Sequence, residues 1–147
     1  MKTIERPVST AHRPRAIEIR GGELGHQAYS SLYLGYTILP IVAGADKFSH
    51  WLVDWNQYLS PLAARLVGGN VDAFMKAVGV VEIAAGLLVA VKPRWGALVV
   101  CLWLLGIIGN LLLIPAYFDI ALRDFGLAVG AFALWRLSGQ YGESTKA

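Results

Sequence analysis

The stretch from Ala73 to Val91 (AFMKAVGVVEIAAGLLVAV) constrains the fold most, because it is long, apolar and carries one carboxylate, Glu82, at its centre. As an α-helix it would rise about 28 Å at ~1.5 Å per residue, close to the roughly 30 Å of bilayer hydrocarbon. A carboxylate at that depth is costly unless it faces other helices and has a partner. Gly79 and Gly86 lie at helical spacing from Glu82 and suit close packing on that face.

The composition points to the membrane as well. Of the 147 residues, 56% are hydrophobic and only 16% are charged, which is too apolar for an ordinary soluble domain. The net charge of +3 does not indicate nucleic-acid binding, because the basic residues lie in an amino-terminal tail and in short loops. That distribution is typical of the cytoplasmic flanks of membrane helices.

Three further apolar runs complete the predicted architecture, an all-α integral membrane four-helix bundle over residues 25–138. The basic tail 1–24 lacks the apolar core of a signal peptide and is expected to be partly disordered, and 139–147 form a second tail. Helical spans are predicted at about 28–45, 73–91, 95–114 and 118–137.

An amphipathic segment from Phe48 to Gly69 separates the first two spans. Ser60 followed by Pro61 is typical of a helix start, so we expect two short helices with a break at Ser60. Trp51 and Trp55 favour a position in the membrane interface for this segment.

Basic residues predict the orientation. Five lie in the amino-terminal tail, and Lys92 and Arg94 flank the turn between the second and third spans. The positive-inside rule places both termini and this turn in the cytoplasm. The amphipathic segment then lies on the outer side of the membrane.

With this topology, Glu82, Asn110, Arg123 and Asp124 all lie between the midplane and the outer face, with Asp119 closer to that face. We expect their polar faces to meet inside the bundle. The predicted partner of Glu82 is Arg123, because an unpaired carboxylate at the midplane is the costlier arrangement.

Other pairings remain open. Asp119 and Arg123 are four residues apart and can pair locally, which would leave Glu82 with Asn110 or a proton. If Arg123 instead pairs with Glu82, Asp124 pairs elsewhere, with Lys47 as one partner. Asp46 and Lys47 themselves are interpreted as a solvated helix end.

Such a cluster can hold helices together, relay protons, or bind quinones and other amphipathic ligands. A protonated Glu82 would be able to donate to a quinone carbonyl. Gly126 and Gly130 form a GxxxG pattern that serves either a homo-oligomer or packing within one chain.

Several chemistries lack the residues they need. The histidines His12, His26 and His50 provide no facing pair for haem, and no zinc or di-iron spacing occurs. Cys101 is the single cysteine, and no phosphate-binding glycine loop or nucleophile set is present. We predict no metal site and expect any redox cofactor to reside in a partner.

The runs GYTILPIVAGADKF, VGVVEIAAGLLVAVKPRWGA and DIALRDFGLAVGAFALWRL resemble the DoxX-like family of small bacterial membrane proteins. The most specific elements are the E-x-x-x-G beginning at Glu82 and the RD-x-G from Arg123 to Gly126. The resemblance implies a four-helix bundle in the bacterial inner membrane. It further implies thiosulfate and quinone oxidation in some members and redox complexes in others, and it marks Glu82, Arg123 and Asp124 as family-like polar positions.

Together these observations favour an accessory, noncatalytic subunit of a respiratory or redox assembly that contacts quinone. Its partners would be the lipid bilayer and redox-enzyme subunits. The outer segment, with Asp46, Lys47, His50, Trp51 and Trp55, would form a lid or docking surface. The alternatives are a proton-coupled carrier that titrates Glu82 and a purely structural assembly protein.

Overall fold

The structure, a computed structural model, describes residues 15–142. Its elements are all helical, with no strand among the described residues, which confirms the all-α class. In chain order they are α1 (Arg15–Ser49), η1 (Trp55–Tyr58), α2 (Pro61–Leu66), α3 (Val71–Val91), α4 (Pro93–Leu112) and α5 (Phe118–Tyr141).

Helix α1 is longer than predicted. It begins at Arg15, so residues 15–24, which we assigned to the amino-terminal tail, belong to the first helix. It also continues through Pro40 and past Asp46 to Ser49. The rest of the predicted amino-terminal tail, residues 1–14, lies outside the described residues, as do residues 143–147 of the carboxyl-terminal tail.

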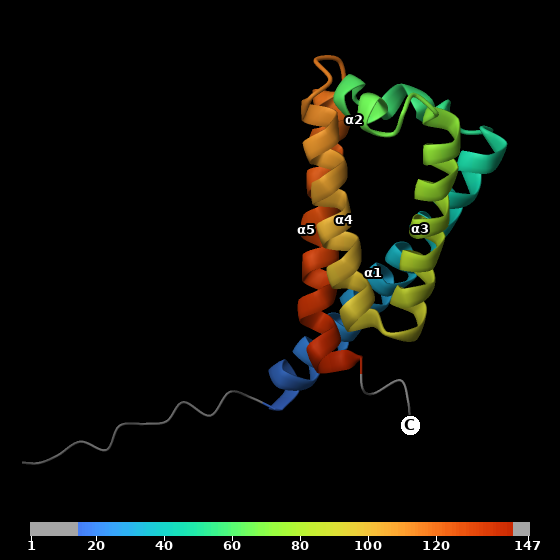
Figure 1. The fold of residues 1–147 in the computed structure, drawn as a ribbon. Coiled ribbons are helices and arrows are strands. Elements are labelled where there is room, and N and C mark those ends of the chain that lie inside the picture. Colours follow the sequence, from blue (N-terminus) through green and yellow to red (C-terminus); the bar gives the residue numbers. More distant parts are fainter. Residues whose placement is uncertain (1–14, 143–147) are drawn as a thin grey trace, which may run out of the picture.

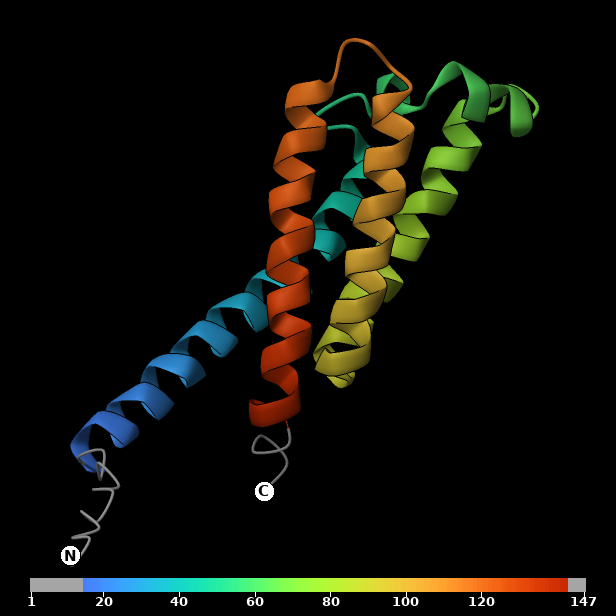
Figure 2. The ribbon, with the colours of Figure 1, turned by 90° about the vertical axis from the view of Figure 1, so that its left-hand side faces the viewer.

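The helices pack as two pairs, α1 with α3 and α4 with α5. The pairs approach each other at the end of the molecule where α1 begins and α5 ends, here called the termini end (Figure 1). At the opposite end, η1 and α2 cross between them, and this is called the roof end. The first part of α1 projects away from the other helices (Figure 2).

Local sequence signals fix the short helices, as expected. The side chain of Ser60 accepts a hydrogen bond from the amide of Ala63 at 3.2 Å, and Pro61 is the first residue of α2. Gly68 and Gly69 adopt positive φ angles of 69° and 79°, which side chains disfavour, and so turn the chain into α3. The break predicted at Ser60 is confirmed.

The hydrophobic core lies toward the termini end and is built from small and aromatic residues. Val89, Ala97, Ala131 and Leu134 are completely buried. Gly96 lies directly against the backbone of Val89, where even a Cβ atom would clash. Small residues therefore hold the two helix pairs together at this end.

Two helices, α3 and α4, are long and apolar enough to cross a membrane. Only 33% of the most apolar window of α3, and 22% of that of α4, is buried. The outward faces of α1 and α5 are apolar too, with exposed residues that include Leu34, Ile38, Val42, Leu122, Phe125 and Val129. So much exposed apolar surface is typical of contact with lipid rather than water.

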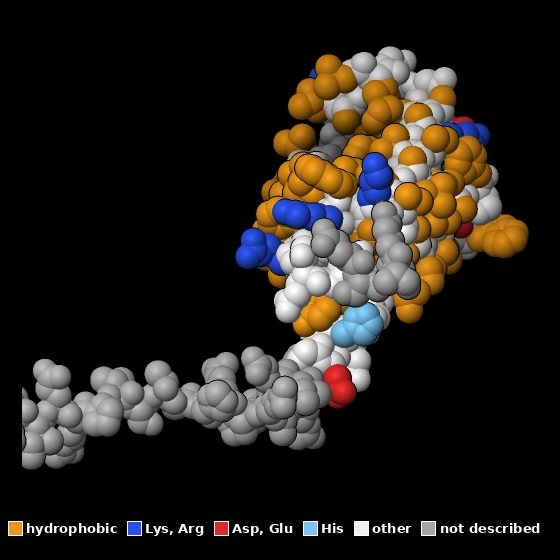
Figure 3. Space-filling model, turned by 90° about the horizontal axis from the view of Figure 1, so that it is seen from below, with side chains coloured by type: hydrophobic (Ala, Val, Ile, Leu, Met, Phe, Trp, Pro, Cys, Tyr) orange, Lys and Arg blue, Asp and Glu red, His pale blue; other side chains and the backbone are white. Residues whose placement is uncertain are grey.

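Figure 3 views the molecule from the termini end, where hydrophobic side chains cover much of the visible surface and Lys and Arg side chains lie among them. Lys92, Arg94 and Arg136 are exposed at this end.

Candidate functional site

A cavity of about 520 Å³ lies between the two helix pairs, below η1 and α2. We call it the chamber. Its wall is mostly apolar, and this volume falls within the roughly 300–1,000 Å³ typical of small-molecule sites. The polar side chains that line it are those of Tyr36, Lys47, Trp55, Tyr58, Glu82, Trp103, Asn110, Arg123 and Asp124.

We call the segment from Trp51 to Leu66, which contains η1 and α2, the roof. Asn110 of α4 binds one side of it. Its Oδ1 accepts from the amide of Ser60 at 2.9 Å, and its Nδ2 donates to the carbonyl of Tyr58 at 2.6 Å. Ser60 is completely buried. The amide side chain thus satisfies both a donor and an acceptor of the chain that leads from η1 into α2.

Asp46 of α1 fastens the other side. Its carboxylate accepts from the indole Nε1 of Trp55 at 2.7 Å and from the amides of Trp51 and Leu52 at 2.9 and 3.1 Å. The hydroxyl of Ser49 donates to the same carboxylate at 3.2 Å. One carboxylate therefore shapes the loop that leads into η1.

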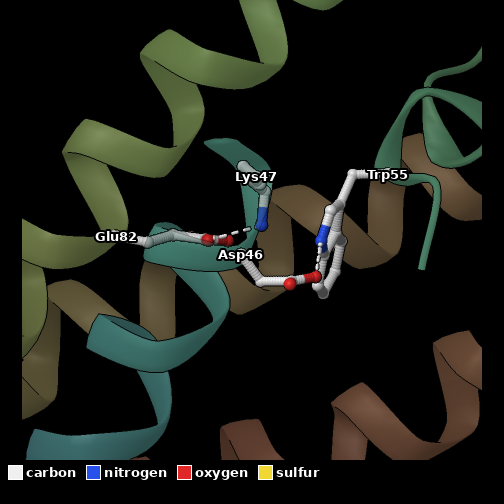
Figure 4. A network of polar contacts seen from close by, with 4 residues as sticks. All are labelled: Asp46, Lys47, Trp55 and Glu82. Carbon is white, nitrogen blue, oxygen red and sulfur yellow. Dashed lines mark hydrogen bonds and ion pairs between the residues drawn. The ribbon is translucent and has the colours of Figure 1, made fainter. Parts of the chain in front are cut away.

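Lys47, the next residue, forms the central ion pair of the chamber. Its Nζ lies 2.5 Å from Oε2 of Glu82, and the side chains are only 3% and 10% exposed. The Trp55 ring faces the same ammonium, with its centroid 3.7 Å from Nζ. Figure 4 shows Lys47 between Glu82 and Trp55, while Asp46 reaches the indole nitrogen of Trp55.

Two glycines bring these side chains together. A Cβ atom on Gly44 would lie 2.5 Å from the carbonyl oxygen of Gly79, and one on Gly79 would lie equally close to that of Gly44. Only glycine permits this approach of α1 and α3. Gly44 precedes Lys47 by one turn, as Gly79 precedes Glu82, so both side chains extend from the closest part of the helix crossing.

A second ion pair lies across the chamber on α5. Arg123 donates from Nε to Oδ1 of Asp124 at 3.0 Å. The Asp124 side chain is 7% exposed, whereas that of Arg123 is 64% exposed. Asp119 is exposed and has no hydrogen bond or ion pair among the described residues.

These contacts correct several predictions. The predicted pair Arg123 with Glu82 is wrong, because Lys47 holds Glu82 and Arg123 turns back to its neighbour Asp124. The pairing proposed together with it, Asp124 with Lys47, and the alternative, Asp119 with Arg123, are wrong for the same reason.

Asp46 and Lys47 are not a solvated helix end either, since they are 5% and 3% exposed. The reason is that α1 continues to Ser49, which keeps both residues inside the helix and beside α3. The paired glycines Gly44 and Gly79 were the sequence signal that could have identified Lys47 as the partner of Glu82.

The remaining predicted positions do not line the chamber. His50 is half-buried with a positive φ of 54°, and Trp51 is 89% exposed. Gly130 contacts the hydroxyl of Tyr36, so it serves packing within the chain. Gly126 has open space around it. Of the two glycines of the GxxxG pattern, only Gly130 therefore packs against another helix of the described residues.

Within residues 15–142, no group of three His, Cys, Asp or Glu residues lies close enough together to hold a metal ion. No protein-family model, curated protein or solved structure matches this chain.

Proposed function

We propose that this chain is an integral membrane protein with four spanning helices, α1, α3, α4 and α5. Two observations support the proposal. Helices α3 and α4 have the length and hydropathy of membrane spans, and most residues of their apolar windows are not buried within the protein. Helices α1 and α5 expose large apolar residues beside them, so lipid would cover all four.

We further propose the bacterial inner membrane, with both termini in the cytoplasm and the roof on the outer side. The exposed basic residues Lys92, Arg94 and Arg136 at the termini end support this orientation. On the roof, the exposed Trp51 and the neighbouring Leu52 suit the interface. Membership in the DoxX-like family is part of the proposal and rests on the sequence motifs alone.

For the function, we infer that the chamber binds a neutral, amphipathic molecule dissolved in the membrane, with quinone as the first candidate. The carrying observation is an apolar cavity whose charges cancel: Lys47 with Glu82 and Arg123 with Asp124. A charged ligand would leave one charge buried without a partner, whereas a neutral one would not. The chain would act as a noncatalytic subunit of a respiratory or redox assembly.

The first test is native purification in a mild detergent, with mass spectrometry of the co-purifying proteins and the extracted lipids. Recovery of quinone or of a cofactor-bearing enzyme in stoichiometric amount is expected. A bare chain with no quinone and no redox enzyme would overturn the proposal.

A matched pair of variants locates the ligand. Gly106 lines the chamber and has open space for a side chain, so Gly106→Leu should fill part of the cavity and reduce quinone recovery. Gly109 is on the same helix with equally open space, but it does not line the chamber. Gly109→Leu should therefore leave quinone recovery unchanged.

A proton-coupled carrier is the second candidate, because the buried carboxylate of Glu82 lines the chamber. In that case Glu82→Gln should abolish substrate flux in proteoliposomes while Asp119→Asn, at an exposed carboxylate, leaves flux intact. Flux that is indifferent to Glu82→Gln would exclude the carrier.

A further inference from the structure

Lys47 has more hydrogen-bonding capacity than its neighbours use. Its ammonium carries three N–H donors, and Glu82 is its one hydrogen-bond acceptor among the described residues. The Trp55 ring covers a second side of the ammonium through its π face, which is not an oxygen acceptor. Lys47 is 3% exposed and lines the chamber, so a further acceptor would reach its ammonium from the chamber.

The surroundings of Lys47 fix its position. Glu82 and Trp55 lie on two sides of Nζ, and Trp55 is itself held by Asp46 at 2.7 Å. A cation held in this way loses little side-chain entropy when it binds a further acceptor. The geometry is therefore preorganised for an acceptor that approaches from the chamber.

Charge selects the kind of acceptor. Glu82 already neutralises Lys47, so an anionic head group would leave a net negative charge in an apolar cavity. A neutral carbonyl oxygen accepts a charge-assisted hydrogen bond without adding charge.

We propose that Lys47 is the head-group recognition residue of the chamber and donates to a carbonyl oxygen of a neutral, lipid-soluble ligand, with Glu82 setting the preference for neutral over anionic head groups. This inference rests on the proposed ligand-binding function and adds the chemistry by which the head group is selected. The apolar wall of the chamber would take the rest of the ligand.

The test compares two probes on the full chain purified in detergent. A decyl-substituted benzoquinone carries carbonyl acceptors, and decylbenzene has the same tail without them. Quinone binding is followed by quenching of tryptophan fluorescence, since Trp55 and Trp103 line the chamber. Decylbenzene binding is measured by its displacement of the quinone.

The main variant is K47M/E82M, which removes both charges and so leaves no unpaired ion in the apolar cavity. It should bind the quinone at least about tenfold more weakly than wild type, as loss of a hydrogen bond to a charged group predicts. Decylbenzene affinity should be unchanged. Lys76→Met, which removes an exposed lysine paired with Asp72, is the control and should bind both probes like wild type.

A second variant tests the role of Glu82 separately and keeps an amide oxygen that can accept from Lys47. In Glu82→Gln the ammonium stays but its counter-charge is lost, so affinity for decanoate should rise relative to that for the quinone.

The outcomes separate the inference from the proposed function. If wild type binds neither decyl probe saturably, the proposed function fails. If wild type binds the quinone and K47M/E82M binds it within twofold, the recognition role of Lys47 is wrong while the ligand-binding function stands. An unchanged preference in Glu82→Gln would refute the role assigned to Glu82.

Discussion

The two ends of the bundle are built from the same four helices in opposite ways. At the termini end, small and aromatic residues such as Ala97, Ala131 and Tyr29 are buried in the core, and Gly96 touches the backbone of the neighbouring helix. Toward the roof end the helix pairs leave the chamber, which the buried charged residues Lys47, Glu82 and Asp124 line, and the buried Asp46 binds Trp55 of its wall.

The comparison indicates that the packed termini end stabilises the bundle, whereas the end with the chamber is available for binding. Close packing at one end fixes the distance between the pairs, so the other end can remain hollow. The half of the bundle around the chamber is held by specific polar contacts rather than by close packing of apolar side chains. Substitutions should therefore have different effects in the two halves.

The largest effect is expected for Glu82→Met, which leaves Lys47 as a buried cation without its counter-charge. Removing one partner of a buried pair typically costs about 3–5 kcal/mol. The double variant K47M/E82M should recover most of that loss. Thermal unfolding in detergent measures both, and a double variant no more stable than the single one would contradict the account of the roof half.

In the termini half, Gly96→Ala should cost about 1–3 kcal/mol, because its new methyl group meets the backbone of Val89. The clash is with the backbone, so a change of side-chain rotamer cannot relieve it. Gly109→Ala, placed in open space on the same helix, is the control and should be neutral or slightly stabilising. Equal unfolding temperatures for the two variants would show that close packing does not hold this end.

Asp46→Asn should loosen the roof without unfolding the bundle, because the charge that attracts the indole and amide donors is lost. Faster hydrogen exchange is expected at Trp51 and Leu52 and not at residues around Val89. Asp119→Asn, at an exposed carboxylate, should leave exchange unchanged. Faster exchange throughout the chain would mean that the two halves are not separable.

The smallest effect is expected for Lys76→Met. This lysine pairs with Asp72 at 2.8 Å, but both side chains are about half exposed, and water screens such pairs. The unfolding temperature should stay within error of wild type. A loss as large as that of Glu82→Met would remove the distinction between buried and exposed ion pairs.

Much of the fold follows from local sequence signals. Hydropathy places α3 and α4 within two residues of their observed bounds, and Ser60 with Pro61 marks the start of α2. The same signals fail at α1, whose first turns are polar and therefore read as a tail. Helices that extend beyond the apolar stretch are difficult to predict from hydropathy alone.

The site was harder to predict, because partners are decided by how the helices cross. The depth argument identified Glu82 as a buried group and brought Asn110 and Asp124 to the same level. The prediction pairs Glu82 with Arg123, because an unpaired carboxylate at the midplane is the costlier arrangement, and it interprets Lys47 as part of a solvated helix end. The close crossing of α1 and α3 at Gly44 and Gly79 reverses that choice, and no periodicity in either helix alone reveals a crossing point.

Asp46 and Lys47 are consecutive residues on one turn of α1, yet one holds the roof and the other holds α3. A helical turn is stiff, so a rotation of α1 that withdraws Lys47 from Glu82 also drags the carboxylate that anchors Trp55. The loop that leads into η1 and the Lys47–Glu82 ion pair should therefore move together. A movement that opens the roof would therefore also change the charge balance inside the chamber, because Asp46 and Lys47 are adjacent in the chain.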